Sequence, residues 1–104
     1  MTRTKKNPSY RIALIHALAE SVEPARRCFA QSWPEATVFD LLDTSLATDL
    51  VHSQQLTNDI VERFKTLGRY ARNTSGVGGG TKGILFTCSA FGPAIEAVKR
   101  EMDV

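Results

Sequence analysis

The stretch GILFTCSAFGPAI, residues 83–95, decides the fold that we expect for this chain. Its first nine residues, 83–91, are mostly apolar and predict a buried strand that carries Cys88. The Gly-Pro step that follows opens a helix, because proline suits the first helical turn, where its missing N–H would have had no partner. The apolar residues that share one face of this helix are Ile95, Val98 and Met102.

Two further segments with strand character precede this stretch. Residues 11–18, RIALIHAL, form a short and nearly continuous apolar run, which is typical of a strand buried on both faces of a parallel sheet. Residues 36–42, ATVFDLL, are also rich in types that favour strands. The sequence therefore predicts three strands.

Amphipathic helices are expected between these strands. Residues 21–33 start at Ser21, a candidate N-cap, and stop at Pro34. Their apolar positions recur at helical spacing: Val22, Ala25, Phe29 and Trp33. Residues 56–71 carry the clearest stripe, made of Leu56, Ile60, Phe64, Leu67 and Ala71.

Loops are expected in the two remaining connections. Residues 43–55 are polar and indicate at most one short helical turn. Residues 72–82, RNTSGVGGGTK, indicate a flexible turn-rich loop. Its glycines do not predict a phosphate-binding loop, because such a loop follows a strand and opens a helix, whereas this one has the reverse order.

The alternation of strands and helices predicts an α/β fold, a three-layer sandwich with a short parallel sheet of strand order 2-1-3 flanked by helices. Residues 1–10 are expected to be a flexible N-terminal tail, and residues 11–104 a single α/β domain. A sheet of three strands has two exposed edges, which favours assembly with a partner chain.

Composition and charge narrow the class of protein. The net charge of +2 over 104 residues indicates neither nucleic acid nor a membrane surface as partner. The first apolar run is short and contains Arg11 and His16, so we expect no secretory signal peptide. The 2 cysteines then indicate free thiols in a reducing compartment, and a cytoplasmic location.

Candidate site residues follow the predicted strands, since ligands of open parallel sheets bind at the carboxyl ends of the strands. His16, Asp43 and Cys88 stand at these ends, and His16 and Cys88 would lie on adjacent strands. The start of the last helix favours a thiolate and a bound anion, for which Ser89 and the backbone from Ala90 onward would supply donors. A small residue at a tight strand-to-helix turn explains Cys88 equally well.

Simpler interpretations stay open for the other reactive side chains. His16 is either a general acid or base or a hydrogen-bonded structural residue, and Asp43 is either a site residue or a helix cap. Cys28, inside the first helix, is expected to be buried and inert. The spacing of His and Cys residues predicts no metal site.

The motif ILFTCSAFGPAI, residues 84–95, resembles the aspartate/glutamate racemase superfamily, which includes hydantoin racemases and arylmalonate decarboxylases. In that family a strand ends in a catalytic cysteine, followed by a small or hydroxyl residue and a helix. Residues 11–46 and 56–71, RIALIHALAESVEPARRCFAQSWPEATVFDLLDTSL and LTNDIVERFKTLGRYA, are similar to the first half of the family in the same order.

The resemblance implies a cofactor-independent enzyme, with neither pyridoxal phosphate nor a metal, that moves the Cα proton of a small carboxylate between two cysteines. Cys88 matches the first of these cysteines, and Ser89 matches the position that binds the substrate carboxylate. Such an enzyme must fix base and acid near a very weak carbon acid and stabilise the charge that develops on the carboxylate. His16 and Asp43 would lie in the substrate-site loops.

The family's second cysteine belongs to a second, similar α/β half, with the site between the halves. We therefore expect this chain to act as an enzyme only together with a second half, from a longer chain or from a second copy. The alternative function is a non-catalytic α/β module that binds a small anion or assembles through its exposed sheet edge.

Overall fold

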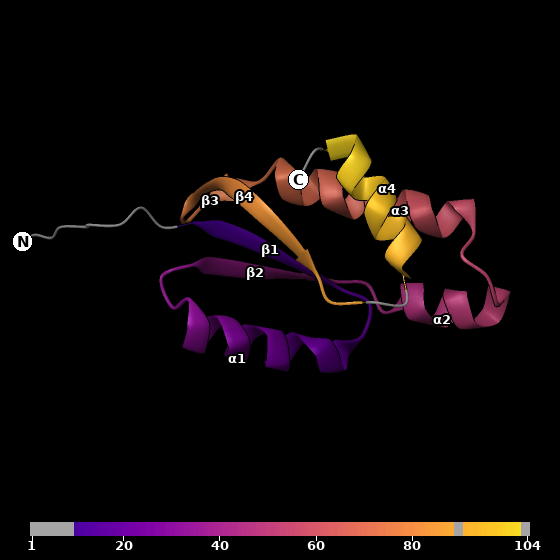
Figure 1. Ribbon diagram of the computed structural model, residues 1–104, viewed down its shortest axis with the longest axis horizontal. Helices are drawn as coiled ribbons and strands as arrows, with labels where there is room; N and C mark the ends of the chain where they lie inside the picture. The colour runs from indigo at the N-terminus through magenta and orange to yellow at the C-terminus, as the bar shows by residue number, and fades with distance from the viewer. Residues whose placement is uncertain (1–9, 89–90, 103–104) are drawn as a thin grey trace, which may run out of the picture.

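The computed structural model describes residues 10–88 and 91–102, which form a sheet with helices on both faces (Figure 1). The predicted N-terminal tail, apart from Tyr10, lies outside the described residues. In chain order the elements are β1 (Arg11–His16), the 3-10 turn η1 (Ala19–Ser21), α1 (Val22–Ser32), β2 (Thr37–Leu42), α2 (Ser45–Ser53), α3 (Asn58–Arg72), β3 (Ser75–Gly76), β4 (Gly79–Phe86) and α4 (Gly92–Met102).

The sheet has four strands in the order β2-β1-β4-β3. β1 pairs in parallel with β2 on one side and with β4 on the other. β3 is only two residues long and pairs antiparallel with the start of β4. The three strand segments expected from the sequence in the order 2-1-3 correspond to β2, β1 and β4, which are parallel, with β1 in the middle. The antiparallel β3 was not expected and makes the sheet a mixed one of four strands.

The additional strand comes from residues 72–82, where the sequence indicated a flexible loop. Ser75 pairs with Gly80 and Gly76 with Gly79, so this segment is a tight β-hairpin. Gly78 adopts a φ of 88°, and a Cβ built there would lie 3.0 Å from the Cβ of Thr37. The glycine-rich composition thus serves a left-handed turn packed close against β2, which the loop interpretation missed.

A second departure concerns residues 43–55, where at most one short helical turn was expected. They form the nine-residue helix α2. Leu46 is completely buried in the core, which gives this helix an anchor. Ala47 and Leu50 pack partly buried against the same core, and this packing stabilises a helix that the polar composition of the segment did not predict.

The main core lies between the sheet and helices α3 and α4. Alternate residues of β1, Ala13 and Ile15, belong to this core together with Phe64 of α3 and Val98 of α4. The Phe64 ring is 4.8 Å from the ring of Phe91, measured between centroids. The apolar stripe predicted for α3 is confirmed here, since the side chains that it buries include Ile60, Phe64 and Ala71.

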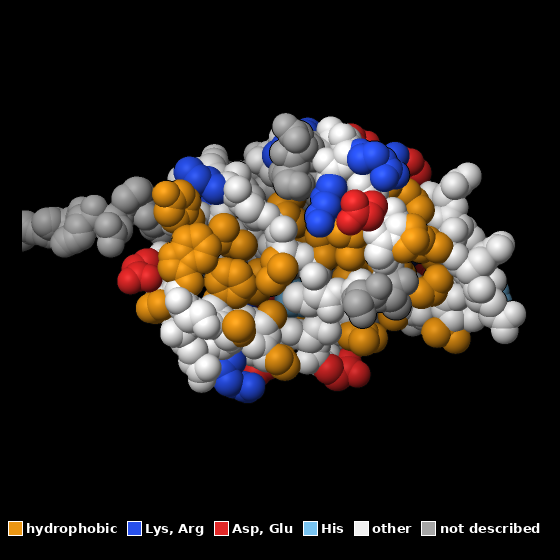
Figure 2. Space-filling model, in the orientation of Figure 1, with side chains coloured by type: hydrophobic (Ala, Val, Ile, Leu, Met, Phe, Trp, Pro, Cys, Tyr) orange, Lys and Arg blue, Asp and Glu red, His pale blue; other side chains and the backbone are white. Residues whose placement is uncertain are grey.

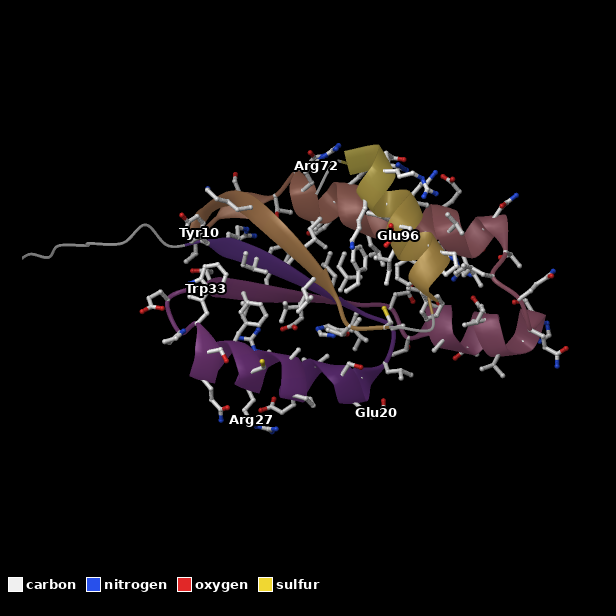
Figure 3. All side chains as sticks on the ribbon, in the orientation of Figure 1. Tyr10, Glu20, Arg27, Trp33, Arg72 and Glu96 are labelled. Atoms are coloured by element: carbon white, nitrogen blue, oxygen red, sulfur yellow. The ribbon has the colours of Figure 1, made fainter. Side chains whose placement is uncertain are left out.

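The opposite face of the sheet is covered by α1, so it has fewer helices packed on it than the face under α3 and α4 (Figure 1). No residue of α1 is buried, and Leu85 of β4 is 43% exposed. Tyr10 and Trp33 lie side by side with their ring centroids 5.6 Å apart (Figure 3), and Figure 2 shows apolar side chains gathered in this region. One helix leaves part of the apolar sheet surface uncovered, so this face carries open grooves on both sides of α1.

Candidate functional site

The carboxyl ends of β1 and β4 lie side by side, as expected from the sequence. The backbone N–H of Thr87 donates to the carbonyl oxygen of Ile15 at 3.1 Å and joins the two strand ends. Successive side chains of a strand point to opposite faces of a sheet. His16 and Thr87 accordingly face α1, whereas Cys88 packs with the core residues on the other face. The sheet therefore separates the two predicted reactive residues.

Cys88 lies at the wall of a cavity of about 370 Å³ near the start of α4. The residues that line this cavity come from the end of β1, from α2 and from the start of α4: Ala17, Leu18, Ala47, Leu50, Val51, Thr87, Cys88 and Phe91. Apart from Thr87 and Cys88 these side chains are apolar. Cys88 thus supplies the thiol of a largely apolar cavity, to which Thr87 contributes the other polar side chain.

The surroundings of Cys88 favour the thiol over the thiolate. Burial raises the pKa of Cys88 above its ordinary value, while backbone N–H groups, first that of Ala17, act in the opposite direction. The Sγ atom is 4.0 Å from the carbonyl oxygen of Ile15, within reach of a weak S–H donor. A protonated thiol of this kind is a proton donor in its resting state and becomes a strong base only after losing its proton.

His16 is completely buried and uses both ring nitrogens. Its Nε2 lies 2.8 Å from Oδ1 of Asp40 on β2, and its Nδ1 lies 2.7 Å from Oγ1 of Thr87. The second carboxylate oxygen of Asp40 accepts a hydrogen bond from Nη1 of Arg26 on α1 at 2.7 Å. A continuous chain of hydrogen bonds, the Arg26–Asp40–His16–Thr87 network, thus crosses three strands under α1.

The Asp40 carboxylate constrains the hydrogen on one nitrogen of the imidazole. A carboxylate only accepts hydrogen bonds, so the ring donates to Asp40 from Nε2. In the neutral ring Nδ1 then accepts from the Thr87 hydroxyl, for which the carbonyl oxygen of Ile15, at 3.4 Å, is the competing acceptor. A doubly protonated ring would instead donate from Nδ1 to Thr87 Oγ1. This geometry is consistent with His16 as a hydrogen-bonded structural residue. Its hydrogen bond to Thr87 also links it to a residue that lines an open groove.

Asp43 does not join either cluster. Its Oδ1 accepts from the backbone N–H of Ser45 at 2.9 Å and from the Ser45 hydroxyl at 2.6 Å. These bonds satisfy a donor at the start of α2, which is the capping interpretation of this residue. Asp43 therefore orders the turn after β2.

The sequence-based predictions for Ser89 and Ala90 stay untested, and the prediction for Cys28 is wrong. Ser89 and Ala90, predicted to hold the substrate carboxylate, lie outside the described residues. Cys28, predicted to be buried, is exposed on α1, because α1 covers its face of the sheet alone and buries none of its own residues. Cys28 lines the groove between α1 and the end of β4.

Asp40 and Thr87 are functional candidates that the sequence did not single out. Asp40 interrupts the apolar strand ATVFDLL, and a charged residue within a buried strand signals a partner across the sheet. Thr87 directly precedes Cys88, at the strand end that the cysteine already marks. Both signals are present in the sequence, but only the strand pairing shows which histidine they meet.

Residues 10–88 and 91–102 contain neither a side-chain cluster typical of a metal site nor a helix that could span a membrane. No three His, Cys, Asp or Glu side chains in this part of the chain gather as they would around a metal ion. Within the same residues, each helix lacks the length or the apolar character needed to cross a membrane.

Comparisons with protein-family models, with curated proteins and with solved structures found no match to this chain. The resemblance to the racemase superfamily therefore stays a prediction that rests on the sequence motifs. We infer function from the geometry of the two faces of the sheet.

Proposed function

We propose that this chain is a racemase-like α/β unit for cofactor-independent proton transfer at the Cα of an amino acid or a related small carboxylate, with Cys88 as the acid/base. It completes its active site with a second half, either from a longer chain or from a second copy. The observation that supports this proposal is the position of Cys88, which follows the end of β4 and faces a cavity of about 370 Å³.

The surroundings of Cys88 suit the chemistry of carbon acids. A proton next to a carboxylate leaves only when base and acid are held within hydrogen-bond reach of the carbon. The largely apolar lining of the cavity screens charge less than bulk water does, which strengthens the interactions of the charge that develops during the reaction. Burial raises the pKa of the Cys88 thiol, so it is protonated at rest, and the proposal takes the second acid/base from the completing half.

A homo-oligomer is the simplest way to complete such a site. The outer edge of β4 is paired by the two-residue strand β3 only near its start, at Gly79 and Gly80. Among the described residues no other strand covers that edge. An unpaired strand edge is a template for another chain, so we expect a second copy or a second half to associate there.

The alternative function is a non-catalytic module that binds a small anion or assembles through the same edge. The exposed apolar side chains on the α1 face, Leu85 among them, favour assembly in this interpretation. The two functions differ in what they require of Cys88, because only the enzyme needs its thiol.

Deuterium incorporation at Cα, followed by proton NMR in heavy water, tests the proposal. The substrates are a panel of amino acids, hydantoins and substituted malonates, and the variants are Cys88→Ser and, as matched thiol control, Cys28→Ser. We expect exchange in the unmodified chain and in Cys28→Ser. Cys88→Ser should be slower by about 100-fold or more, the usual contribution of a general acid or base.

Equal exchange in Cys88→Ser and in the unmodified chain would overturn the role of Cys88. Absence of exchange throughout the panel, together with a stable oligomer that is indifferent to these ligands, would support the non-catalytic module instead. Sedimentation of the same samples reports the oligomer and thus separates the two functions.

A further inference from the structure

The α1 face contains a reactive constellation that the Cys88 chemistry does not use. Asp40, His16 and Thr87 are hydrogen-bonded in series, at 2.8 Å between Asp40 and His16 and at 2.7 Å between His16 and Thr87. This is the order of groups in an acid–imidazole–hydroxyl triad, which is recognised by its geometry and roles rather than by its place in a sequence.

We propose that Thr87 is an oxygen nucleophile, with His16 as its general base and Asp40 as the residue that positions His16, and that it accepts the acyl group of small esters. This activity uses other side chains than the proton transfer proposed for Cys88: the Thr87 hydroxyl is hydrogen-bonded to His16 on the α1 face, although Thr87 also borders the Cys88 cavity.

The members of the network differ in burial: the proposed base is more deeply buried than the proposed nucleophile. His16 is 0% exposed, whereas Thr87 is only partly buried and lines the open groove between α1 and β4. The ring is thus shielded from water, while the residue that carries the hydroxyl borders the groove. A purely structural bridge has no need to end on a hydroxyl at the wall of a groove of about 570 Å³.

Arg26 anchors the other end of the triad. Its guanidinium donates to the Asp40 oxygen that His16 does not use, so both carboxylate oxygens are engaged and the carboxylate is fixed in orientation. The carboxylate in turn keeps the ring proton on Nε2, which leaves Nδ1 free to accept the hydroxyl proton. Asp40 therefore acts on Thr87 through the tautomer of His16.

The groove indicates the class of acyl group. Its walls are largely apolar or uncharged, formed by Pro24, Ala25, Cys28, Phe29, Leu85 and Phe86, with Glu20 and Ser21 among the remaining lining residues. A short aliphatic or aromatic acyl chain would lie against the apolar walls with its carbonyl carbon at Thr87. A negatively charged acyl group would meet the carboxylate of Glu20 in a largely apolar groove and is disfavoured.

The covalent step balances without a further reagent. Thr87 Oγ1 attacks the ester carbonyl carbon, its proton passes to Nδ1 of His16, and the bond from that carbon to the alcohol oxygen breaks. The alcohol leaves with the proton from Nδ1, and the acyl group stays on Thr87 as an ester. Water then releases the acid by the same route, with His16 again accepting and returning a proton.

The test uses p-nitrophenyl butyrate with the full chain in a Cys28→Ser/Cys88→Ser background, so that no thiol competes for the acyl group. Intact mass and peptide mapping locate the butyryl group, and released nitrophenolate gives the rate. We expect butyrylation at Thr87, abolished in Thr87→Val and retained in Thr87→Ser. Thr48→Val is the matched control, because the Thr48 hydroxyl donates to the Thr44 carbonyl oxygen at 3.3 Å on the exposed side of α2.

Two variants separate catalysis from a structural bridge. Asp40→Asn preserves shape, but its amide donates to Nε2 and moves the ring proton to Nδ1, so Thr87 loses its base. His16→Gln keeps a polar side chain without an imidazole. Each should slow butyrylation of Thr87 by about 100-fold or more, while far-ultraviolet circular dichroism verifies that the fold is intact.

Butyrylation that is absent from Thr87 in the thiol-free chain would overturn the proposal. An unchanged rate of butyrylation at Thr87 in folded Asp40→Asn would overturn it as well. A nitrogen-detected NMR spectrum of the His16 ring adds an independent readout, because the proposal requires the hydrogen on Nε2 and none on Nδ1.

Discussion

The two faces of the sheet differ at the same strand ends. On the α3 and α4 face, a half-buried thiol packs against the apolar core, and burial is the largest cause of its raised pKa. On the α1 face, a single helix covers a polar network whose side chains are hydrogen-bonded to one another. The carboxyl ends of β1 and β4 thus carry a half-buried thiol on one face of the sheet and, on the other, a hydroxyl hydrogen-bonded to a buried imidazole.

This difference arises because unequal numbers of helices cover the two faces of the sheet. Three helices contribute to the core of one face, while α1 alone covers the other. A polar network is tolerated under α1 because each buried polar atom has a partner, and Arg26 supplies the charge that balances Asp40. The following predictions test this contrast, beginning with the largest effect.

Truncation of an aromatic ring should separate the two faces most strongly. Phe64→Ala removes a completely buried ring from the core and should cost about 3–5 kcal/mol of unfolding free energy. Phe29→Ala on α1 removes a half-buried ring and should cost about 1 kcal/mol. Urea denaturation measures both values, and equal losses would contradict the contrast in packing.

Breaking the polar network should have the next largest effect. Asp40→Ala leaves the buried Nε2–H of His16 without its acceptor and should cost about 1–3 kcal/mol. Arg26→Ala removes an ion pair whose arginine is 44% exposed, and such pairs contribute less than about 1 kcal/mol. Equal losses of unfolding free energy in Arg26→Ala and Asp40→Ala would contradict the view that Asp40 stabilises the fold mainly through the buried imidazole.

Alkaline pH should weaken the fold through Cys88. Because burial raises the pKa of this thiol, the folded chain keeps a proton that the unfolded chain has already lost. The associated stability is complete below the pKa of the unfolded thiol, about 8.5, and is lost as pH rises through the folded value. Unfolding free energies of Cys88→Ser should lack this decline.

The exposed thiol is the control for that experiment. Cys28→Ser leaves Cys88 in place and should keep the alkaline decline. Cys88 should also be alkylated by iodoacetamide more slowly than Cys28 at neutral pH, since it is half-buried. Mass spectrometry of partially alkylated chains measures the order, and preferential labelling of Cys88 would argue against a shielded thiol.

The smallest effect is expected from Leu85→Thr on the open part of the α1 face. Leu85 is 43% exposed, so the change should alter the unfolding free energy by no more than about 0.5 kcal/mol. It should nevertheless weaken self-association if this surface is part of a contact between copies. Sedimentation velocity at several concentrations checks the second point, and a large loss of stability would contradict the exposure of this side chain.

The sequence located the long elements because their signals are local. The stripe from Ile60 to Ala71 predicted α3 by its spacing alone, and Thr57 caps that helix by accepting from the backbone N–H of Ile60 at 3.2 Å. The hairpin at residues 75–80 escaped prediction because it depends on contacts with distant residues. Arg11 of β1 donates to Val77 O and to Thr81 Oγ1, 66 and 70 positions away.

The candidate sites divide in the same way. Cys88 could be singled out from a strand, a thiol and a helix start, which are neighbours in the chain. The partners of His16 stand 24 and 71 positions away, at Asp40 and Thr87. Asp40 and Thr87 contact His16 because β1 lies between β2 and β4 in a particular register. No local sequence pattern predicts that register.

The sequence by itself determined an α/β chain with alternating strands and helices and a cysteine at a strand-to-helix junction. The tertiary structure alone decided that Cys88 and His16 are turned to opposite faces, that Asp43 caps α2, and that Cys28 is exposed. The physical reason is that periodicity fixes which residues lie on the same face of one element. Strand pairing and the number of helices on each face determine what those residues meet.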